Sequence, residues 1–217
     1  MTDTNPLIVD VVSDLVCPWC FIGKRKLEAA LAEFAQAEPS VDVHVRWHPF
    51  QLNPDLPPDG LPRAAYLAQK FGARATDVYV RVERAGEAVG IEFRFDRIEI
   101  QPNTFDGHRL VAWAQQQRDA GELVEQLFRA FFIEGRRIGD IGELSRLAAE
   151  CGWPEEGARA ILQSDALRDV VAGESREAIG AGIQGVPCTI FNRRIAVSGA
   201  QDPEALLQAI SAARAET

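Results

Sequence analysis

The feature that most constrains this chain is the run Cys17-Pro18-Trp19-Cys20, which lies between a short apolar segment and a longer periodic one. Residues 7–12 are mostly β-branched and indicate a buried strand. From Pro18 onward apolar side chains recur at threes and fours, which indicates a helix. Proline suits the first turn of a helix because its missing N–H would have no partner there. The two cysteines therefore lie at a helix N-terminus, one turn apart.

This position at a helix N-terminus favours a reactive cysteine pair. Unpaired N–H groups and the positive end of the helix dipole favour the thiolate of Cys17, and the thiolate is the attacking species in disulfide exchange. Cys20 is close enough to close a small disulfide, so it can resolve a mixed disulfide formed at Cys17. Pro18 and Trp19 separate the two sulfurs, and we expect them to tune the redox potential and contact the substrate.

Half of a zinc site and a pair of inert buried thiols are the other interpretations of this run. A zinc site needs two further ligands, usually at short spacing, and neither Cys151 nor Cys188 has such a partner. Thiols at the start of a helix are seldom inert. The sequence context therefore favours a redox dithiol, and we expect no metal.

Both ends of the chain carry strand patterns. Residues 41–47 alternate apolar and polar side chains and predict a second strand, parallel to the first. Residues 188–191 and 195–198 predict a hairpin whose turn is Asn192-Arg193, although the turn lacks the usual glycine. Asp202 and Pro203 then open a terminal helix through Ala213, with Asp202 as its N-cap.

The middle of the chain is predicted to be helical. Its segments are punctuated by glycines and span residues 64–89, 103–120, 122–134, 141–151, 154–164 and 165–181. The element order is thus βαβ, an all-helical block, and ββα. We predict an α/β fold made from residues 1–60 and 183–217, with a helical domain inserted at 61–182.

The segment Gly185-Val186-Pro187 precedes the third predicted strand. A proline there is normally an edge or turn feature. Next to a dithiol it can instead be a cis-proline that exposes the Val186 backbone to an extended peptide or thiol ligand over Cys17. The presence of the dithiol favours this second interpretation.

Composition limits the partners and the compartment. The formal net charge of −9 disfavours non-specific binding to nucleic acid or to an anionic membrane. No apolar stretch is long enough to span a membrane, and the N-terminus lacks the pattern of a secretory signal. We therefore expect a cytoplasmic protein in a reducing environment, either a monomer or a homodimer.

Five motifs in the same order resemble the FrnE-like branch of the DsbA-family oxidoreductases. They are Ser13 to Lys24 around the dithiol, Pro49 to Pro54, Asn103 to Leu110, Gly185 to Pro187, and Val197 to Gln201. The resemblance covers nearly the whole chain. It implies a thioredoxin-like fold with a helical insertion, Cys17 as nucleophile, Cys20 as resolving thiol and Pro187 as a cis-proline. The implied activity is disulfide exchange with protein or small-molecule thiols.

The same superfamily contains glutathione-dependent isomerases and transferases, which are the alternative function. They typically have serine where Cys17 stands, and the presence of both cysteines points away from them. Their glutathione contacts would correspond to Asn53, Val186 and residues 198–201, so glutathione is the one co-substrate that the resemblance implies. Cys188 departs from the family pattern, and it either packs in the core or places a third thiol near the pair.

Three polar residues near the predicted site allow two interpretations each. His108 either lines a substrate cleft or pairs locally near its helix start. Asp14 either accepts a proton from Cys20 or caps the following helix. His48, at the end of the second strand, either assists proton transfer or lies at the rim with backbone partners.

Overall fold

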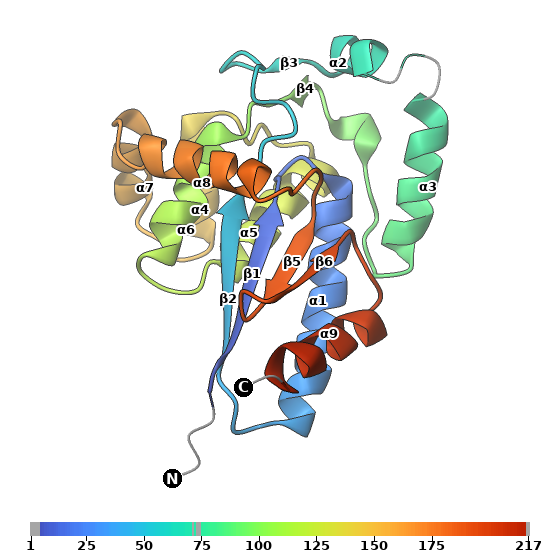
Figure 1. Cartoon of the computed structure of the whole chain (residues 1–217). Helices are drawn as coiled ribbons and strands as arrows, with labels where there is room; N and C mark the ends of the chain where they lie inside the picture. The colour runs from blue at the N-terminus through green and yellow to red at the C-terminus, as the bar shows by residue number, and fades with distance from the viewer. Residues whose placement is uncertain (1–4, 71, 73–74, 216–217) are drawn as a thin grey trace.

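The centre of the molecule is a four-stranded sheet in the order β2-β1-β5-β6. The computed structural model describes residues 5–70, 72 and 75–215. The strands are β1 (Leu7–Ser13), β2 (Val43–Pro49), β5 (Cys188–Phe191) and β6 (Ile195–Ser198) (Figure 1). β2 runs parallel to β1, whereas β5 is antiparallel to both β1 and β6. This is the predicted α/β arrangement, with β2 starting two residues later than expected.

The register of the sheet brings three loops to one edge. Ser13, the last residue of β1, is paired with Pro49, the last residue of β2. Cys188, the first residue of β5, is paired with Val12. The segments that follow β1 and β2 and precede β5 therefore meet at the same end of the sheet. These are the segments that hold the dithiol, Asn53 and Pro187.

The hairpin between β5 and β6 turns at Asn192 and Arg193, as predicted. Both residues are left-handed, with φ of 49° and 57°, and the Phe191 carbonyl accepts a hydrogen bond of 3.0 Å from the Arg194 N–H, so that three residues, 192–194, connect the strands. Asn192 tolerates the left-handed conformation without glycine because its side chain is anchored: Asn192 Oδ1 accepts a hydrogen bond of 2.9 Å from the Ile8 N–H.

Helix α1 (Pro18–Ala37) begins at the predicted proline and packs along one face of the sheet beside α9 (Pro203–Ala215). The opposite face is covered by α4 (Phe105–Gln115) and α8 (Arg168–Gly180) (Figure 1). The residues between β2 and β5 form α2 (Arg63–Lys70), α3 (Ala75–Glu87), α4 (Phe105–Gln115), α5 (Gly121–Arg129), α6 (Ile141–Glu150), α7 (Glu155–Gln163) and α8 (Arg168–Gly180). A π-helical turn, Ala130–Glu134, continues α5.

Two helices are shorter in the structure than the sequence predicts. The helix expected over residues 64–89 is two helices, and Gly72 between them has φ of 54°, which no right-handed helix allows. Residues 71 and 73–74 lie outside the described residues. The helix expected through residue 120 ends at Gln115, and Asp119 Oδ1 accepts a hydrogen bond from the Gly121 N–H where α5 begins.

A short strand pair was not predicted at all. β3 (Leu61–Pro62) pairs antiparallel with β4 (Ile100–Gln101), next to the 3₁₀ turn Phe95–Arg97. The partners are far apart in the sequence, so no local pattern reports the pairing. The pair lies with α2 above the edge of the sheet where β1 and β2 end (Figure 1).

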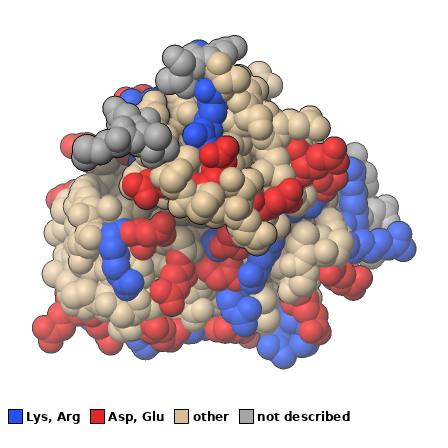
Figure 2. Space-filling model, turned by 90° about the horizontal axis from the view of Figure 1, so that it is seen from below, with Lys and Arg blue, Asp and Glu red and all other residues tan. Residues whose placement is uncertain are grey.

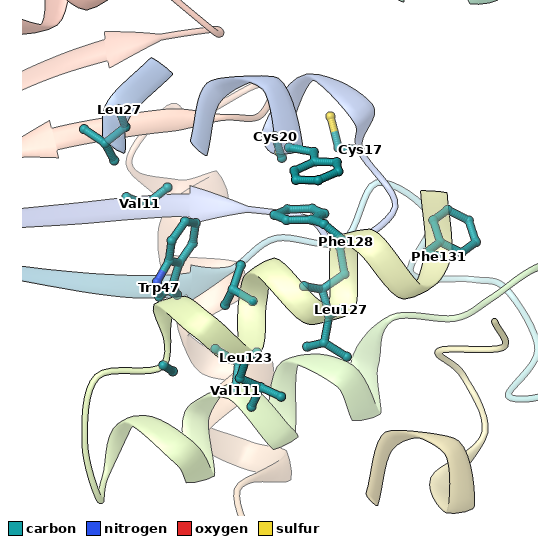
Figure 3. Packing of buried hydrophobic residues seen from close by; sticks show 14 of the residues in the cluster. Val11, Cys17, Cys20, Leu27, Trp47, Val111, Leu123, Leu127, Phe128 and Phe131 are labelled. Atoms are coloured by element: carbon teal, nitrogen blue, oxygen red, sulfur yellow. The ribbon is translucent and has the colours of Figure 1, made fainter. Parts of the chain in front are cut away.

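One hydrophobic core joins the sheet to the helices between β2 and β5. The buried cluster contains Val11 and Trp47 from the sheet together with Leu123 and Phe128 from α5 (Figure 3). The rings of Phe21 in α1 and Phe128 are stacked with centroids 5.1 Å apart. The boundaries of a separate inserted domain stay a prediction, because the packing is continuous across them.

Acidic and basic side chains are intermingled on the lower face of the molecule, with uncharged surface between them (Figure 2). The net charge of −9 is thus not gathered into one acidic area on that face. Within the described residues, none of the helices has the length and apolar character needed to cross a membrane.

Candidate active site

Cys17 occupies the N-cap position of α1. Its backbone is extended, with φ of −94° and ψ of 112°, and its carbonyl accepts a hydrogen bond of 3.0 Å from the Cys20 N–H. In Figure 3 the sulfur of Cys17 points away from the ring of Phe128, although the residue belongs to the buried cluster and is only 5% exposed. Cys17 and Cys20 are both unpaired thiols. The first thiol therefore lies at the N-terminal end of the α1 dipole.

Cys20 lies deeper, with only 1% of its surface exposed. Burial raises the pKa of its thiol well above the usual value, and the neighbouring Cys17 raises it further. The Ser13 hydroxyl and the Asp14 backbone N–H lower it in part. Cys20 is therefore held as a neutral thiol while Cys17 is free, which suits a group that acts second.

The segment before β5 faces the dithiol. The peptide bond between Val186 and Pro187 is cis, and the Val186 carbonyl accepts a weak hydrogen bond of 3.6 Å from Cys17 Sγ. Gly23 in α1 approaches Pro187 so closely that an added Cβ would lie 2.8 Å from Pro187 Cγ. The Pro187 carbonyl accepts a hydrogen bond from the Gly199 N–H at 2.8 Å. The loop is thus fixed between α1 and the end of β6.

Trp19 lies between the two cysteines and is partly buried against the core. The guanidinium of Arg81 in α3 lies 5.9 Å from the centre of its ring. This is within the range of a cation–π interaction. Sequence reasoning missed Arg81, because only the packing of α3 beside α1 brings it near.

Asn53 is tied to α2. Its Oδ1 accepts hydrogen bonds from Lys70 Nζ at 2.9 Å and from the Tyr66 hydroxyl at 3.2 Å. Its Nδ2 is buried and has no hydrogen-bond partner among the described residues. The preceding residue, Leu52, donates its N–H to Asp14 Oδ2 at 2.8 Å, which links this loop to the one before Cys17.

His108 and Asp14 lie together. His108 is 6% exposed and Asp14 is fully buried, and His108 Nε2 is 3.5 Å from Asp14 Oδ1. His108 Nε2 therefore faces the Asp14 carboxylate. A role in contacting the substrate stays a prediction for Pro18, Trp19, Asn53, Val186 and His108.

His48, Cys188 and Cys151 are the remaining candidates, and Val186 packs against the cluster that contains Cys188. His48 bridges Asp10 and Glu174, at 3.0 and 3.3 Å, and these carboxylates raise its pKa to about 9. Cys188 packs in a small cluster with Val12, Phe50 and Ala178, and burial raises its pKa. Burial also raises the pKa of Cys151, to about 11. In the part of the chain that the structure describes, no three His, Cys, Asp or Glu residues gather as metal ligands would.

Comparison with known proteins identifies the family. Residues 8–211 match the DSBA-like thioredoxin domain. The chain belongs to this DsbA-like family. It is 30% identical over 211 residues to the uncharacterized protein YwbO of Bacillus subtilis, a match that covers 94% of this chain and 95% of YwbO. The protein is thus a DsbA-like oxidoreductase, and the role of Cys17 and Cys20 as its redox pair stays a prediction.

Two solved structures show the same DsbA-like fold. A probable DsbA oxidoreductase from Streptomyces coelicolor has a TM-score of 0.86 at 32% identity, covering 97% of this chain and 91% of that one. The cytosolic disulfide reductase DsbM from Pseudomonas aeruginosa, solved with GSH, has a TM-score of 0.63 at 22% identity, covering 96% of both chains. The expected thioredoxin-like fold is therefore confirmed.

Proposed function

We propose that Cys17 attacks disulfides of proteins and of small molecules, and that Cys20 resolves the mixed disulfide. The observation that carries the proposal is the position of Cys17 at the N-cap of α1, with its sulfur facing the Val186 carbonyl. A substrate that lies along Val186 would present its sulfur to Cys17. Cys20 is buried and has a raised pKa, so it takes part only after Cys17 has formed a mixed disulfide with the substrate.

We propose glutathione as the small-molecule partner, used as a co-substrate. Its peptide backbone can hydrogen-bond with the Val186 main chain, whose carbonyl oxygen lies 3.6 Å from Cys17 Sγ. The buried Asn53 Nδ2 is a donor that lacks a partner among the described residues. The related fold of DsbM was solved with GSH, which supports the proposal.

We place the protein in the cytoplasm, where glutathione keeps thiols reduced. The relative DsbM is a cytosolic reductase. In such a compartment the exchange would run toward reduction of substrate disulfides when glutathione regenerates the dithiol. The protein would work there as a monomer or a homodimer.

The test is turnover of insulin disulfides with reduced glutathione as the electron source. Cys17→Ser should abolish turnover, and Cys20→Ser should lower it strongly while leaving a glutathione adduct on Cys17. Cys151→Ser is the matched control, because its buried thiol lies at the end of α6 beside the Glu122 carbonyl, and this variant should leave the rate unchanged. Turnover that survives Cys17→Ser would overturn the proposal. Full activity in Cys20→Ser would show that glutathione, and not Cys20, resolves the mixed disulfide, and would overturn the proposed role of Cys20.

A further inference from the structure

A buried polar cluster beside Cys20 has no part in the exchange as proposed so far. It consists of Ser13 at the end of β1, Asp14 next to it, and His108 in α4. Ser13 is 4%, Asp14 0% and His108 6% exposed. Ser13 Oγ, Asp14 Oδ1 and His108 Nε2 form no hydrogen bond of ordinary geometry with any described residue. Three such atoms in one place are unusual, because buried polar groups nearly always have partners.

A small cavity adjoins this cluster. Its volume is about 10 Å³, and both Ser13 and His108 line it. A volume of roughly that size holds one water molecule when polar groups surround it. Ser13 also reaches the other way, since its hydroxyl lies close enough to Cys20 to lower the pKa of that thiol. Ser13 and His108 thus both line the cavity, and Ser13 is also the side chain that acts on the Cys20 thiol.

Cys20 needs a path for its proton. It attacks a mixed disulfide only as a thiolate, so its proton must leave first. With 1% of its surface exposed, Cys20 has almost no contact with bulk water. A general base within reach typically accelerates a step of this kind by about 10²–10⁴-fold.

We propose that the His108–Asp14 pair accepts the proton of Cys20 through the Ser13 hydroxyl and one water in the adjoining cavity. This inference rests on the proposed role of Cys20 as the resolving thiol. Asp14 Oδ1, 3.5 Å from His108 Nε2, stabilises the imidazolium that forms. Asp14 Oδ2 is already fixed by the Leu52 N–H, so the carboxyl group is held in place.

The step balances in protons and electrons. The Cys20 S–H proton passes to the His108–Asp14 pair, and the Cys20 sulfur then forms a bond with the Cys17 sulfur. The bond between Cys17 and the substrate sulfur breaks, and its electron pair leaves with the substrate as a thiolate. That thiolate takes one proton, and the pair returns its own to the solvent. The substrate disulfide is reduced and the enzyme dithiol is oxidised.

His48 is the other titratable group that lines the cavity, and it is poorly suited to this role. Its two ring nitrogens already lie at Asp10 in β1 and Glu174 in α8, at 3.0 and 3.3 Å. These carboxylates raise its pKa to about 9, so it is protonated at neutral pH and cannot accept a second proton. The titratable groups along the path itself are Cys20, His108 and Asp14.

The experiment separates the two thiol steps with Ellman's reagent. Attack by Cys17 on the reagent releases one thionitrobenzoate, and resolution by Cys20 releases a second, so rapid mixing gives two phases. His108→Gln should leave the first phase within about twofold and slow the second at least about tenfold at pH 7. Between pH 7 and 9 the second phase of this variant should rise with pH about tenfold per unit, because hydroxide replaces the lost base. In the wild type, which keeps the base, the second phase should rise less steeply over the same range, whereas a purely structural role of His108 would slow the second phase by the same factor at every pH.

His44→Gln is the matched control, since His44 is exposed on β2, and both phases should equal those of the wild type. If His108→Gln does not fold, Ser13→Ala interrupts the path at its first group and should slow only the second phase. An unchanged second phase in whichever variant folds would overturn the inference. A missing second phase in the wild type, or its persistence in Cys20→Ser, would instead overturn the proposed roles of the two cysteines.

Discussion

Burial and partners, more than residue type, distinguish the titratable side chains of this protein. Cys20, Cys151 and Cys188 are all buried, and burial raises the pKa of each thiol. His48 shows the opposite balance, because two carboxylates outweigh its partial burial and raise its pKa to about 9. The stability of the protein should therefore depend on pH through single residues such as His48.

His48→Gln should lower stability most at acidic pH. The pKa of His48 in the folded protein, about 9, is above its ordinary value of 6.5. Its contribution is therefore fully present below about pH 6.5 and is lost as the pH rises through about 9. With a third of the side chain exposed, we expect about 1–2 kcal/mol after solvent screening. Urea unfolding at pH 6 and pH 10 measures the free energy of unfolding of both proteins. A difference in this free energy between wild type and variant that does not shrink at pH 10 would contradict the prediction.

At the scale of elements, the contact between α1 and the loop before β5 positions the site. Gly23 lies one turn beyond Cys20, and only a residue without Cβ leaves room there for Pro187. The helix that carries the dithiol is thus fixed against the loop that carries Val186. A shift of either element changes the distance between Cys17 and a substrate held by that loop.

Gly23→Ala should destabilise the protein by about 1–3 kcal/mol, the usual cost of overpacking. The higher helix propensity of alanine offsets this by only about 1 kcal/mol. Activity in the insulin assay should fall as well, because Pro187 must move. Gly173→Ala in α8, where nothing lies within 4 Å of the added Cβ, is the control and should raise stability by up to about 1 kcal/mol. Equal effects of the two substitutions on stability and rate would refute the argument.

At the scale of the whole molecule, the sheet and the helices between β2 and β5 share one core. Trp47 from the sheet and Trp153 from the helical segment belong to the same buried cluster. Neither part can lose its packing without exposing apolar surface of the other. The molecule should therefore unfold as one unit, although the sequence divides it into two.

Urea unfolding tests this cooperativity. Trp47→Phe removes a fluorophore from the sheet, so the remaining signal reports more on the helical segment. Trp153→Phe does the reverse. Within each variant, the fluorescence and far-UV circular dichroism transitions should have the same midpoint and slope. Two separated transitions would instead establish residues 61–182 as an independent domain.

Local chemistry made much of this structure predictable. The start of α1 at Pro18 and the turn at Asn192-Arg193 follow from a few neighbouring residues, and the structure has both. The pairing of Leu61 with Gln101 and the approach of His108 to Asp14 depend on residues far apart in the sequence. Such contacts are set by tertiary packing, which no single segment encodes.

The most direct test of the central claim is to trap the mixed disulfide on the first cysteine. Cys20→Ser is treated with cystamine, a small disulfide that needs no glutathione site, and its peptides are mapped by mass. The account predicts one cysteamine adduct on Cys17, none on Cys151 or Cys188, and a Cys17–Cys20 disulfide in the treated wild type. An adduct located mainly on another cysteine, or a wild type without the Cys17–Cys20 disulfide, would contradict it.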